Sequence, residues 1–461
     1  MKMAKRSLSL LLLICLLLAC LSGCQQPGQT GPETTPVQDP VVDASTPTEE
    51  TTPEFVDYVA QTKLDMSSDT MKQEVTVKTY VDGDTVHFNV PNHVMEGGVL
   101  KGRFLAINTP ESTGKIEEYG KAASRFTKET LKNATSIILE SDTAIWNADS
   151  TGGRYLVWVW YKTAESDEYR NLNIEILQNG LAIASNSGGN RYGTTCLAAI
   201  AQAKAYKLNV HSGQKDPDFY YGDAVELTLK ELRTNIDQYN GVKVAFTGVI
   251  TRENSQTVYV EAYDSENDMY YGMAVYYGYG LSGAGLEILT VGNEVRIVGT
   301  VQYYETGGTW QVSGLTYRAM KPDDPSNIQK ISEGNQPGYP VVDPKLFTKG
   351  EVTVVSEEGD ITAPFAQLAM SSSIAMENLR VVDVYTTHKE DSSSKGAMTL
   401  TCSAGGVTIS VRTVVLYDEN GNLVTADRYN GRIINVRGIV DYYDGTYQIK
   451  VFSPNDITIV N

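Results

Sequence analysis

The sequence predicts a mainly β protein, built of small β-barrels that carry a few helices. Short runs alternate apolar and polar residues, and Gly-containing turns separate them. A pattern near residue 300 returns near residue 440, which indicates two similar domains. The chain has 461 residues with 41% hydrophobic content, and a single core stops growing at about 250–300 residues. We therefore expect three barrel domains.

Residues 1–24 are predicted to be an export signal rather than part of the fold. Three basic residues within the first six positions precede a nearly continuous Leu run, which ends in the sequence LSGC at 21–24. This order is typical of a secretory signal. It also resembles the bacterial lipoprotein cleavage box, in which the Cys after the cut carries a lipid, so Cys24 is the expected lipidation site. A simple transmembrane anchor is the alternative.

The segment that follows the signal, residues 25–55, is predicted to be a disordered tether. It consists mostly of Gln, Pro, Thr, Gly and Glu, and such a composition buries too little apolar surface to offset the entropy of ordering. We therefore expect a protein of the cell envelope, held at the membrane by a lipid and facing outside the cytoplasm. Whether the host has one membrane or two is left open.

The net charge of −18, taken alone, argues against a nucleic-acid partner, but the charge is unevenly distributed. Residues 72–215 contain 16 Lys and Arg against 15 Asp and Glu, so the acidity lies in the tether and the C-terminal half. Those parts should repel polyanions, whereas the first domain should not.

The first domain is expected at residues 72–215. Its predicted strands are 74–80, 86–90, 99–107, 136–139 and 155–161, and its predicted helices are 116–131, 172–179 and 195–208. An Asp-Gly turn at residues 82–83 joins the first two strands as a hairpin. Gly180 is expected to stop the second helix.

One short β-meander in this domain gathers the groups that phosphate chemistry needs. The acidic turn supplies Asp84, and the third strand supplies Arg103 and ends in Asn108, Thr109 and Glu111. A phosphodiester needs a hard cation on one oxygen, guanidinium groups on the others and a carboxylate that orients a water. The meander therefore predicts a phosphodiester site.

Six motifs occur in this domain in a fixed order. They are DGDT at 82–85, RFL at 103–105 leading to NTPE at 108–111, EYG at 118–120, GR at 153–154, ILQNGLA at 176–182 and AQAK at 201–204. With these motifs, the segment from Lys72 to Ser212 resembles the staphylococcal nuclease-like (thermonuclease) family, an OB-type barrel of five strands with three helices.

The resemblance implies a calcium site at the acidic turn. Its ligands would be the carboxylate of Asp84, the side chain of Asn108 and the backbone carbonyl of Thr109. The family pattern has Asp where this chain has Asn108. An Asn oxygen can coordinate Ca²⁺, but one formal negative charge is lost, and calcium affinity depends on ligand charge. We therefore expect weaker metal binding.

Three further residues match the family's catalytic positions. Glu111 matches the carboxylate that orients or deprotonates the attacking water, and Arg103 and Arg154 match the arginines that bind the phosphate. The simpler interpretation is that Glu111 caps its loop and that the arginines are surface cations. The two tyrosines that hold the nucleotide in the family are replaced by Asn186 and Gly188, and Tyr192 is a nearby substitute.

The C-terminal half contains the repeat. Residues 293–304 align with 432–443, and each copy reads as two antiparallel strands around a Gly-containing turn. Each is expected to close a barrel begun by an earlier strand pair, 242–250 with 257–262 and 379–385 with 398–402. The resulting domains, 222–320 and 346–461, resemble OB-type modules. Residues 321–345, rich in Pro, are expected to link them.

The cysteines, the histidines and the paired tyrosines could also have chemical roles, but the sequence favours structural roles for them. Cys196 and Cys402 are expected to be buried free thiols, and the four histidines show no metal-ligand spacing. The tyrosine pairs of the C-terminal strands are either stacking platforms for single strands or, as their acidic setting favours, half-buried strand faces. These pairs are 270–271, 276–277, 303–304 and 442–443.

The resemblance implies a nuclease that hydrolyses DNA or RNA phosphodiesters with Ca²⁺ and leaves 3′-phosphate ends. The N-terminal signal predicts that it is anchored at the cell surface, and we expect a monomer. Two alternatives remain. The first is a protein that binds nucleic acid or oligosaccharide without turnover, which Asn108 and the absent tyrosines favour. The second is a structural envelope protein whose barrels bind other proteins. Metal-dependent cleavage discriminates among them.

Overall fold

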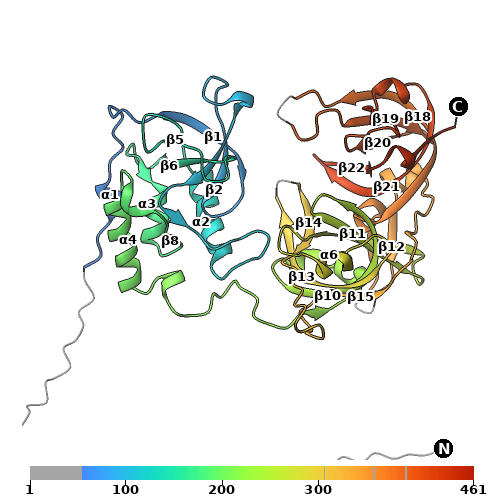
Figure 1. Ribbon diagram of the computed structural model, residues 1–461, viewed down its shortest axis with the longest axis horizontal. Coiled ribbons are helices and arrows are strands. Elements are labelled where there is room, and N and C mark those ends of the chain that lie inside the picture. The colour runs from blue at the N-terminus through green and yellow to red at the C-terminus, as the bar shows by residue number, and fades with distance from the viewer. Residues whose placement is uncertain (1–53, 306, 357–358, 390–391, 461) are drawn as a thin grey trace, which may run out of the picture. The chain divides into compact units, whose positions relative to one another are not determined.

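The computed structural model describes residues 54–460 except 306, 357–358 and 390–391 (Figure 1). The export signal at 1–24, the lipidation site Cys24 and nearly all of the tether at 25–55 therefore lie outside the described residues. In the part of the chain that is described, no helix combines the length and the apolar character needed to cross a membrane.

The chain forms three closed barrels of five strands with few helices. The sequence predicts the three barrels, and it predicts five strands for the first of them. All three barrels have the same strand order. Numbered along the chain within each barrel, the strands are arranged 1-2-3-5-4, and the fourth strand closes the barrel against the first in the second and third barrels. In every barrel the third strand pairs with the fifth in parallel. In the first barrel, all the other strand pairs are antiparallel. This shared order is the OB-type topology.

The elements of the first domain follow the predicted order. They are α1 (Tyr58–Gln61), β1 (Lys72–Tyr80), β2 (Thr85–Asn89), β3 (Val99–Phe104), β4 (Ile107–Asn108), α2 (Gly120–Lys132), β5 (Ser136–Glu140), β6 (Tyr155–Lys162), β7 (Arg170–Asn171), α3 (Leu172–Gln178), β8 (Ile183–Ala184) and α4 (Gly193–Ala205). Strands β1, β2, β3, β6 and β5 close the barrel, and α3 and α4 pack together beside it (Figure 1).

The alternation of apolar residues along these strands builds the core. Phe88, Leu100, Phe104, Leu139 and Trp158 are almost fully buried and belong to one hydrophobic cluster. In β1 the register with β2 shifts between Val77 and Thr79. Such a bulge bends a strand, and it allows β1 to pair with β2 at one end and β5 at the other.

The first predicted helix begins four residues later than the expected Ile116. Tyr119 has a left-handed backbone with φ of 64°, which a helix cannot include. Its N–H donates to the Asp216 carboxylate at 2.6 Å, so the turn before α2 is fixed from a distant segment. Gly180 ends α3 with φ of 67°, as predicted.

The C-terminal half contains the second and third barrels. Their elements are β9 (Val225–Glu226), α5 (Leu229–Thr234), β10 (Lys243–Asn254), β11 (Thr257–Asp264), β12 (Met269–Tyr276), α6 (Ala284–Ile288), β13 (Glu294–Tyr304), β14 (Thr309–Ser313), β15 (Gln329–Ser332), α7 (Pro344–Lys349), β16 (Glu351–Val354), β17 (Ile361–Pro364), α8 (Phe365–Leu368), β18 (Ser373–Thr386), β19 (Met398–Ala404), β20 (Val407–Thr413), β21 (Ile433–Tyr443), β22 (Thr446–Val451) and β23 (Ile457–Ile459). The predicted repeat appears as the hairpins β13–β14 and β21–β22.

The two C-terminal barrels share one hydrophobic cluster, which runs from Leu229 to Ile457. The segment 321–345, expected to be a linker, is part of this structure, because β15 adds to β13 and the Val342 N–H donates to the carbonyl oxygen of Ala375 at 2.9 Å. Its prolines limit the length of regular structure but do not release the segment from the barrels.

Both cysteines of the described residues are free and buried, as expected. Cys196 lies in α4 and Cys402 in β19, and burial raises the pKa of each thiol to about 12. A thiol with such a pKa is almost wholly protonated at neutral pH and is a poor nucleophile.

Candidate active site

The acidic turn between β1 and β2 is a tightly fixed loop. The Asp82 carboxylate accepts a hydrogen bond from the Asp84 N–H at 3.1 Å, as a turn former does. The Gly83 carbonyl accepts from the Thr127 hydroxyl of α2 at 2.6 Å. A Cβ at Gly83 would lie 2.9 Å from Ala123 of α2 and from the Thr109 side chain. Glycine therefore allows the turn to pack against α2.

The Asp84 carboxylate lies at the centre of the site and is completely buried. One oxygen contacts the Arg103 guanidinium and accepts from the Thr85 hydroxyl at 3.1 Å. The other oxygen accepts from the Thr109 N–H at 2.9 Å. Burial raises the pKa of Asp84 to about 7, the nearby Asp82 carboxylate adds to the rise, and the Arg103 cation opposes it.

Arg103 joins Asp84 to Asn108. The antiparallel register of β2 and β3 places Arg103 opposite Thr85, next to the acidic turn. A second nitrogen of its guanidinium donates to the Asn108 side-chain oxygen at 2.5 Å. The structure thus brings Asp84, Arg103, Asn108 and Thr109 into one hydrogen-bonded group, although the sequence spreads them over 26 positions from 84 to 109.

The group offers only oxygen donors to a cation. They are the Asp84 carboxylate, the Asn108 amide oxygen and the oxygens of Thr109, whose buried hydroxyl has no hydrogen-bond partner among the described residues. Oxygen donors fit a hard cation such as Ca²⁺ or Mg²⁺. Among the described residues, no group of three His, Cys, Asp or Glu residues is suited to a metal, and the amide Asn108 does not count toward such a group.

Glu111 is held beside this group by its backbone. Its N–H donates to the Glu117 carboxylate at 3.1 Å, and its carbonyl accepts from the Glu117 N–H at 2.9 Å. Gly120 passes so close that a Cβ there would lie 2.1 Å from the Glu111 carbonyl oxygen. Partial burial raises the pKa of the Glu111 carboxyl, the Asp82 charge adds to the rise and Arg103 opposes it.

Arg154 enters from the start of β6. The parallel register with β3 sets Tyr155 beside Gly102, so Arg154 precedes β6 at the edge that also carries Arg103. Its Nε donates to the Asp149 carboxylate at 2.7 Å, and its side chain is 35% exposed. Both Arg154 and Arg103 affect the pKa of Glu111 through their charges, but no hydrogen bond joins Glu111 or Arg154 to the Asp84 group among the described residues.

Tyr192 does not take the place of the absent nucleotide-holding tyrosines. Its ring packs edge-on against Trp158 and Trp160, at centroid distances of 5.0 and 5.4 Å. Its hydroxyl donates to the buried Glu140 carboxylate at 3.0 Å. Tyr192 is therefore a half-buried residue, directly before the first turn of α4, that packs against the barrel.

Three supporting residues were not predicted from the sequence. Glu117 fixes the backbone of Glu111, Asp149 holds Arg154, and Thr127 anchors the acidic turn to α2. The nearest sequence signal is that Glu117 directly precedes the EYG motif at 118–120. Thr127 joins two separate elements, whereas Glu117 and Asp149 bind partners within their own irregular loops, so the spacing of a helix or strand identifies none of them.

An OB-type barrel that carries an acidic turn, oxygen donors and two arginines at one edge belongs to a class of folds suited to phosphate chemistry. Comparison with known proteins specifies the family. A family model described as staphylococcal nuclease homologue matches residues 101–212. The thermonuclease of Staphylococcus intermedius is 30% identical over 148 residues, which cover 31% of this chain and 79% of the thermonuclease. The chain therefore belongs to the staphylococcal nuclease homologue family. The two C-terminal barrels lie outside the residues that the family model matches.

Proposed function

We propose that this chain is a Ca²⁺-dependent nuclease that hydrolyses DNA or RNA phosphodiesters and leaves 3′-phosphate ends. The observation that carries the proposal is the hydrogen-bonded group of Asp84, Arg103, Asn108 and Thr109, with Glu111 directly after it. The group combines an anionic oxygen set with a guanidinium. A phosphodiester is complementary to this group, because one of its oxygens can coordinate a cation and another can accept hydrogen bonds from a guanidinium.

In this proposal each residue has a separate task. Asp84, Asn108 and Thr109 would hold the calcium ion, which when bound would lower the pKa of a water and offset negative charge on the phosphate. Glu111 accepts a proton from the attacking water, and its raised pKa brings it closer to neutral pH, where a general base is most effective. Arg103 and Arg154 bind the phosphoryl oxygens and stabilise the charge that grows on them.

A second function has a specific observation in its favour. Asn108 removes one charge from the cation site, and Asp84 and Asn108 are both already bound by Arg103. A barrel of this kind that binds calcium too weakly would hold nucleic acid or oligosaccharide without cutting it. Turnover is therefore the measurement that separates the two functions.

The test is cleavage of labelled single-stranded DNA by residues 54–461 across a calcium titration, beside the variant Glu111→Gln. We expect calcium-dependent cutting that falls at least a hundredfold in Glu111→Gln, because the base is lost while the shape is kept. Glu96→Gln, a carboxylate outside the site, is the matched control and should cut normally. Binding without cutting by the natural sequence would replace the nuclease proposal with the binding function.

The location of the protein is part of the proposal. We propose that Cys24 carries the lipid, that residues 25–55 form a tether, and that the monomeric enzyme faces outside the cytoplasm, where it degrades external nucleic acid. The support is the sequence LSGC at 21–24 behind an apolar run. Metabolic labelling with a radioactive fatty acid, compared between the natural chain and Cys24→Ala, tests this part of the proposal.

A further inference from the structure

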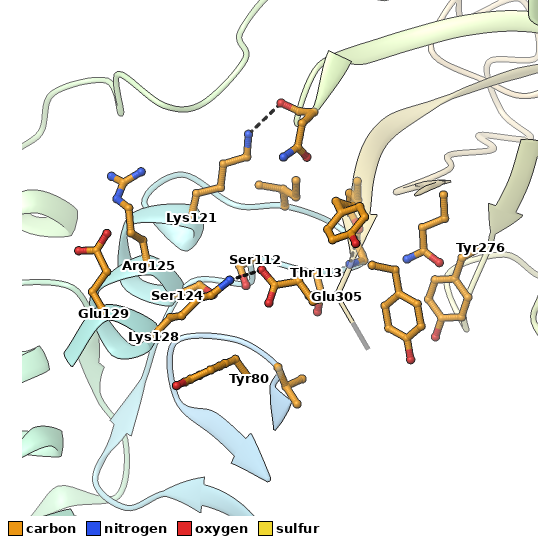
Figure 2. Close-up of a pocket in the computed structure, with 18 of the residues that line it drawn as sticks. Tyr80, Ser112, Thr113, Lys121, Ser124, Arg125, Lys128, Glu129, Tyr276 and Glu305 are labelled. Carbon is orange, nitrogen blue, oxygen red and sulfur yellow. Dashed lines mark hydrogen bonds and ion pairs between the residues drawn. The ribbon is translucent and has the colours of Figure 1, made fainter. Parts of the chain in front are cut away.

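A large cavity opens beside the candidate active site. Its volume is about 950 Å³, and it lies within the compact unit of residues 52–461. Its walls are the loop after Glu111, the helix α2, and strands β12, β13 and β14 of the second barrel (Figure 2). Neither the family resemblance nor the proposed chemistry uses this cavity.

The cavity begins where the candidate active site ends. Val81, which lines it, directly precedes Asp82 of the acidic turn, and Ser112, which also lines it, directly follows Glu111. A polymer bound at the phosphodiester site therefore has an adjacent space for the nucleotides next to the bond that is cut.

The α2 wall carries four cations against one carboxylate, Glu129, although the whole chain is acidic. Lys121, Arg125, Lys128 and Lys132 all line the cavity, and spacings of four, three and four place them along one helix face. Lys128 pairs with Glu305 at 2.5 Å and Arg125 with Asp218 at 2.7 Å. These are exposed pairs, which are weak in water, so a polyanion can replace the carboxylates.

Aromatic rings stand opposite and beside these cations. Tyr80, Tyr276, Tyr303 and Tyr304 line the cavity, and the last two are each 44% exposed. Lys128 lies over the Tyr80 ring, 6.0 Å from its centroid. A groove that combines cations with exposed ring faces suits single strands, because unpaired bases stack on rings while the cations follow the backbone.

Hydrogen bonds join the second-barrel wall of the cavity to the loop that follows Glu111. Gly114 donates to the Gln302 side chain at 3.3 Å, and its carbonyl accepts from Gln302 at 2.8 Å and from the Ser313 hydroxyl at 2.7 Å. Gln302 lies in β13 and Ser313 in β14. The second barrel thus holds the loop that continues from Glu111.

We propose that this cavity is an extended binding channel for single-stranded nucleic acid, in which Lys128 and Lys132 bind phosphates and Tyr276 stacks on a base. For the end of the nucleic acid that enters the active site, the inference rests on the proposed nuclease function. It assigns a role to the second barrel, which is to hold the substrate beyond the bond that is cut.

The test measures the binding of a twelve-nucleotide oligothymidylate to residues 54–461 that carry Glu111→Gln, so that no cutting occurs. Lys128→Ala with Lys132→Ala should weaken binding about tenfold and reduce the slope of log affinity against log salt by about 1.4, the value for two single-strand phosphate contacts. Lys162→Ala is the matched control, because Lys162 also has an exposed partner, Asp167, and a ring, Tyr169. It should bind like the parent.

A second pair of variants tests whether Tyr276 stacks on a base or only supports the fold. Tyr276→Ala should weaken binding about tenfold, whereas Tyr276→Phe keeps the ring face and should bind like the parent. A parent chain that does not bind the oligomer, or lysine and tyrosine variants that bind as well as the controls, would overturn the channel. In that case an acidic protein segment is the next occupant to examine.

A second readout separates this inference from the proposed function. With Glu111 restored, cleavage of a dinucleotide, which is too short to enter the channel, should be equal in the parent and the cavity variants, while cleavage of the oligomer falls. Equal loss for both substrates would contradict the channel. A parent that binds the oligomer through these residues but cuts neither substrate would end the nuclease proposal and leave the channel in place.

Discussion

Asn108 decides how strongly the candidate site can hold a cation. It is the one uncharged side chain among the predicted side-chain ligands, and its oxygen is bound by Arg103 at 2.5 Å. Replacing Asn108 with Asp adds a formal negative charge, and calcium affinity rises with ligand charge. We therefore expect Asn108→Asp to lower the calcium concentration for half-maximal cleavage by about tenfold.

The control for Asn108→Asp adds the same charge elsewhere on the barrel. Asn89 is exposed at the end of β2, where its amide donates to Thr76 at 3.1 Å. Asn89→Asp should leave the calcium requirement unchanged. An equal decrease in both variants would mean that net charge, and not a ligand position, governs calcium binding.

Glu261 gives a prediction about pH and stability. It is 2% exposed in β11, and its carboxylate accepts from the Ser373 N–H at 2.7 Å and the Gly338 N–H at 2.8 Å. Burial is the main effect on Glu261 and raises its pKa above 4.5 in the folded chain, although these hydrogen bonds oppose the rise. The folded state therefore binds more protons than the unfolded state between pH 4.5 and the raised pKa. Stability must fall as the pH rises through this interval.

Calorimetry of the natural chain and of Glu261→Gln at several pH values between 4.5 and 8 measures this effect. The melting temperature of the natural chain, relative to that of the variant, should decrease as the pH rises. Exposed carboxylates contribute equally to both proteins, so the comparison isolates Glu261. Parallel profiles would show that Glu261 keeps an ordinary pKa in the fold.

At the scale of elements, the helix α2 positions both halves of the site. Its first residue, Gly120, touches the backbone of Glu111, and a Cβ there would overlap the Glu111 carbonyl at 2.1 Å. We expect Gly120→Ala to displace Glu111 and to lower kcat at least tenfold, because small displacements of catalytic groups are costly. Circular dichroism should still report a folded barrel.

Gly189→Ala is the matched control for Gly120→Ala. Gly189 lies in a short helical turn, and nothing comes within 4 Å of an added Cβ. Its cleavage rate should equal that of the natural chain. Full activity in Gly120→Ala would show that the loop of Glu111 is free to move without loss of the proposed chemistry.

The sequence predicted the elements whose signals are local. The alternation at 74–80 and 86–90 corresponds to β1 and β2, and the NGLA segment ends α3 at Gly180 as expected. The predicted start of α2 was wrong by four residues, because the Tyr119 N–H donates to the Asp216 carboxylate, almost a hundred positions away, and this fixes Tyr119 before the helix. The third strand of each C-terminal barrel, β12 and β20, was not predicted.

The candidate site follows the same rule. The sequence predicted one group of four residues, Asp84, Arg103, Asn108 and Thr109. They meet because β2, which follows the acidic turn, pairs with β3. The contacts of Asp149 and Glu117 lie within irregular loops, and the cavity beside the site depends on how separate elements pack. No periodic pattern in the sequence carries that information.

At the scale of the whole molecule, the two C-terminal barrels should unfold together. They share one hydrophobic cluster. Arg233, buried in α5, donates to the Gly272 carbonyl at 2.6 Å and to the Met370 carbonyl at 3.3 Å, and so joins β12 to the segment before β18. Buried donors that span two barrels make their separation costly. We expect a single calorimetric transition for the pair.

Gly272→Ala tests this cooperativity, because an added Cβ would lie 2.2 Å from the backbone of Ser371 and Ser372. The backbone must move apart, at a cost of about 2–3 kcal/mol for overpacking, which lowers the melting temperature of the pair by ~5 °C or more. Gly280→Ala, where the nearest atom is 4.0 Å from the added Cβ, should melt like the natural chain. The transition of the first barrel should not change in either variant. If Gly272→Ala and Gly280→Ala have the same melting temperature, the second and third barrels are joined too loosely to stabilise each other. The second barrel would then hold the loop that continues from Glu111 without support from the third barrel.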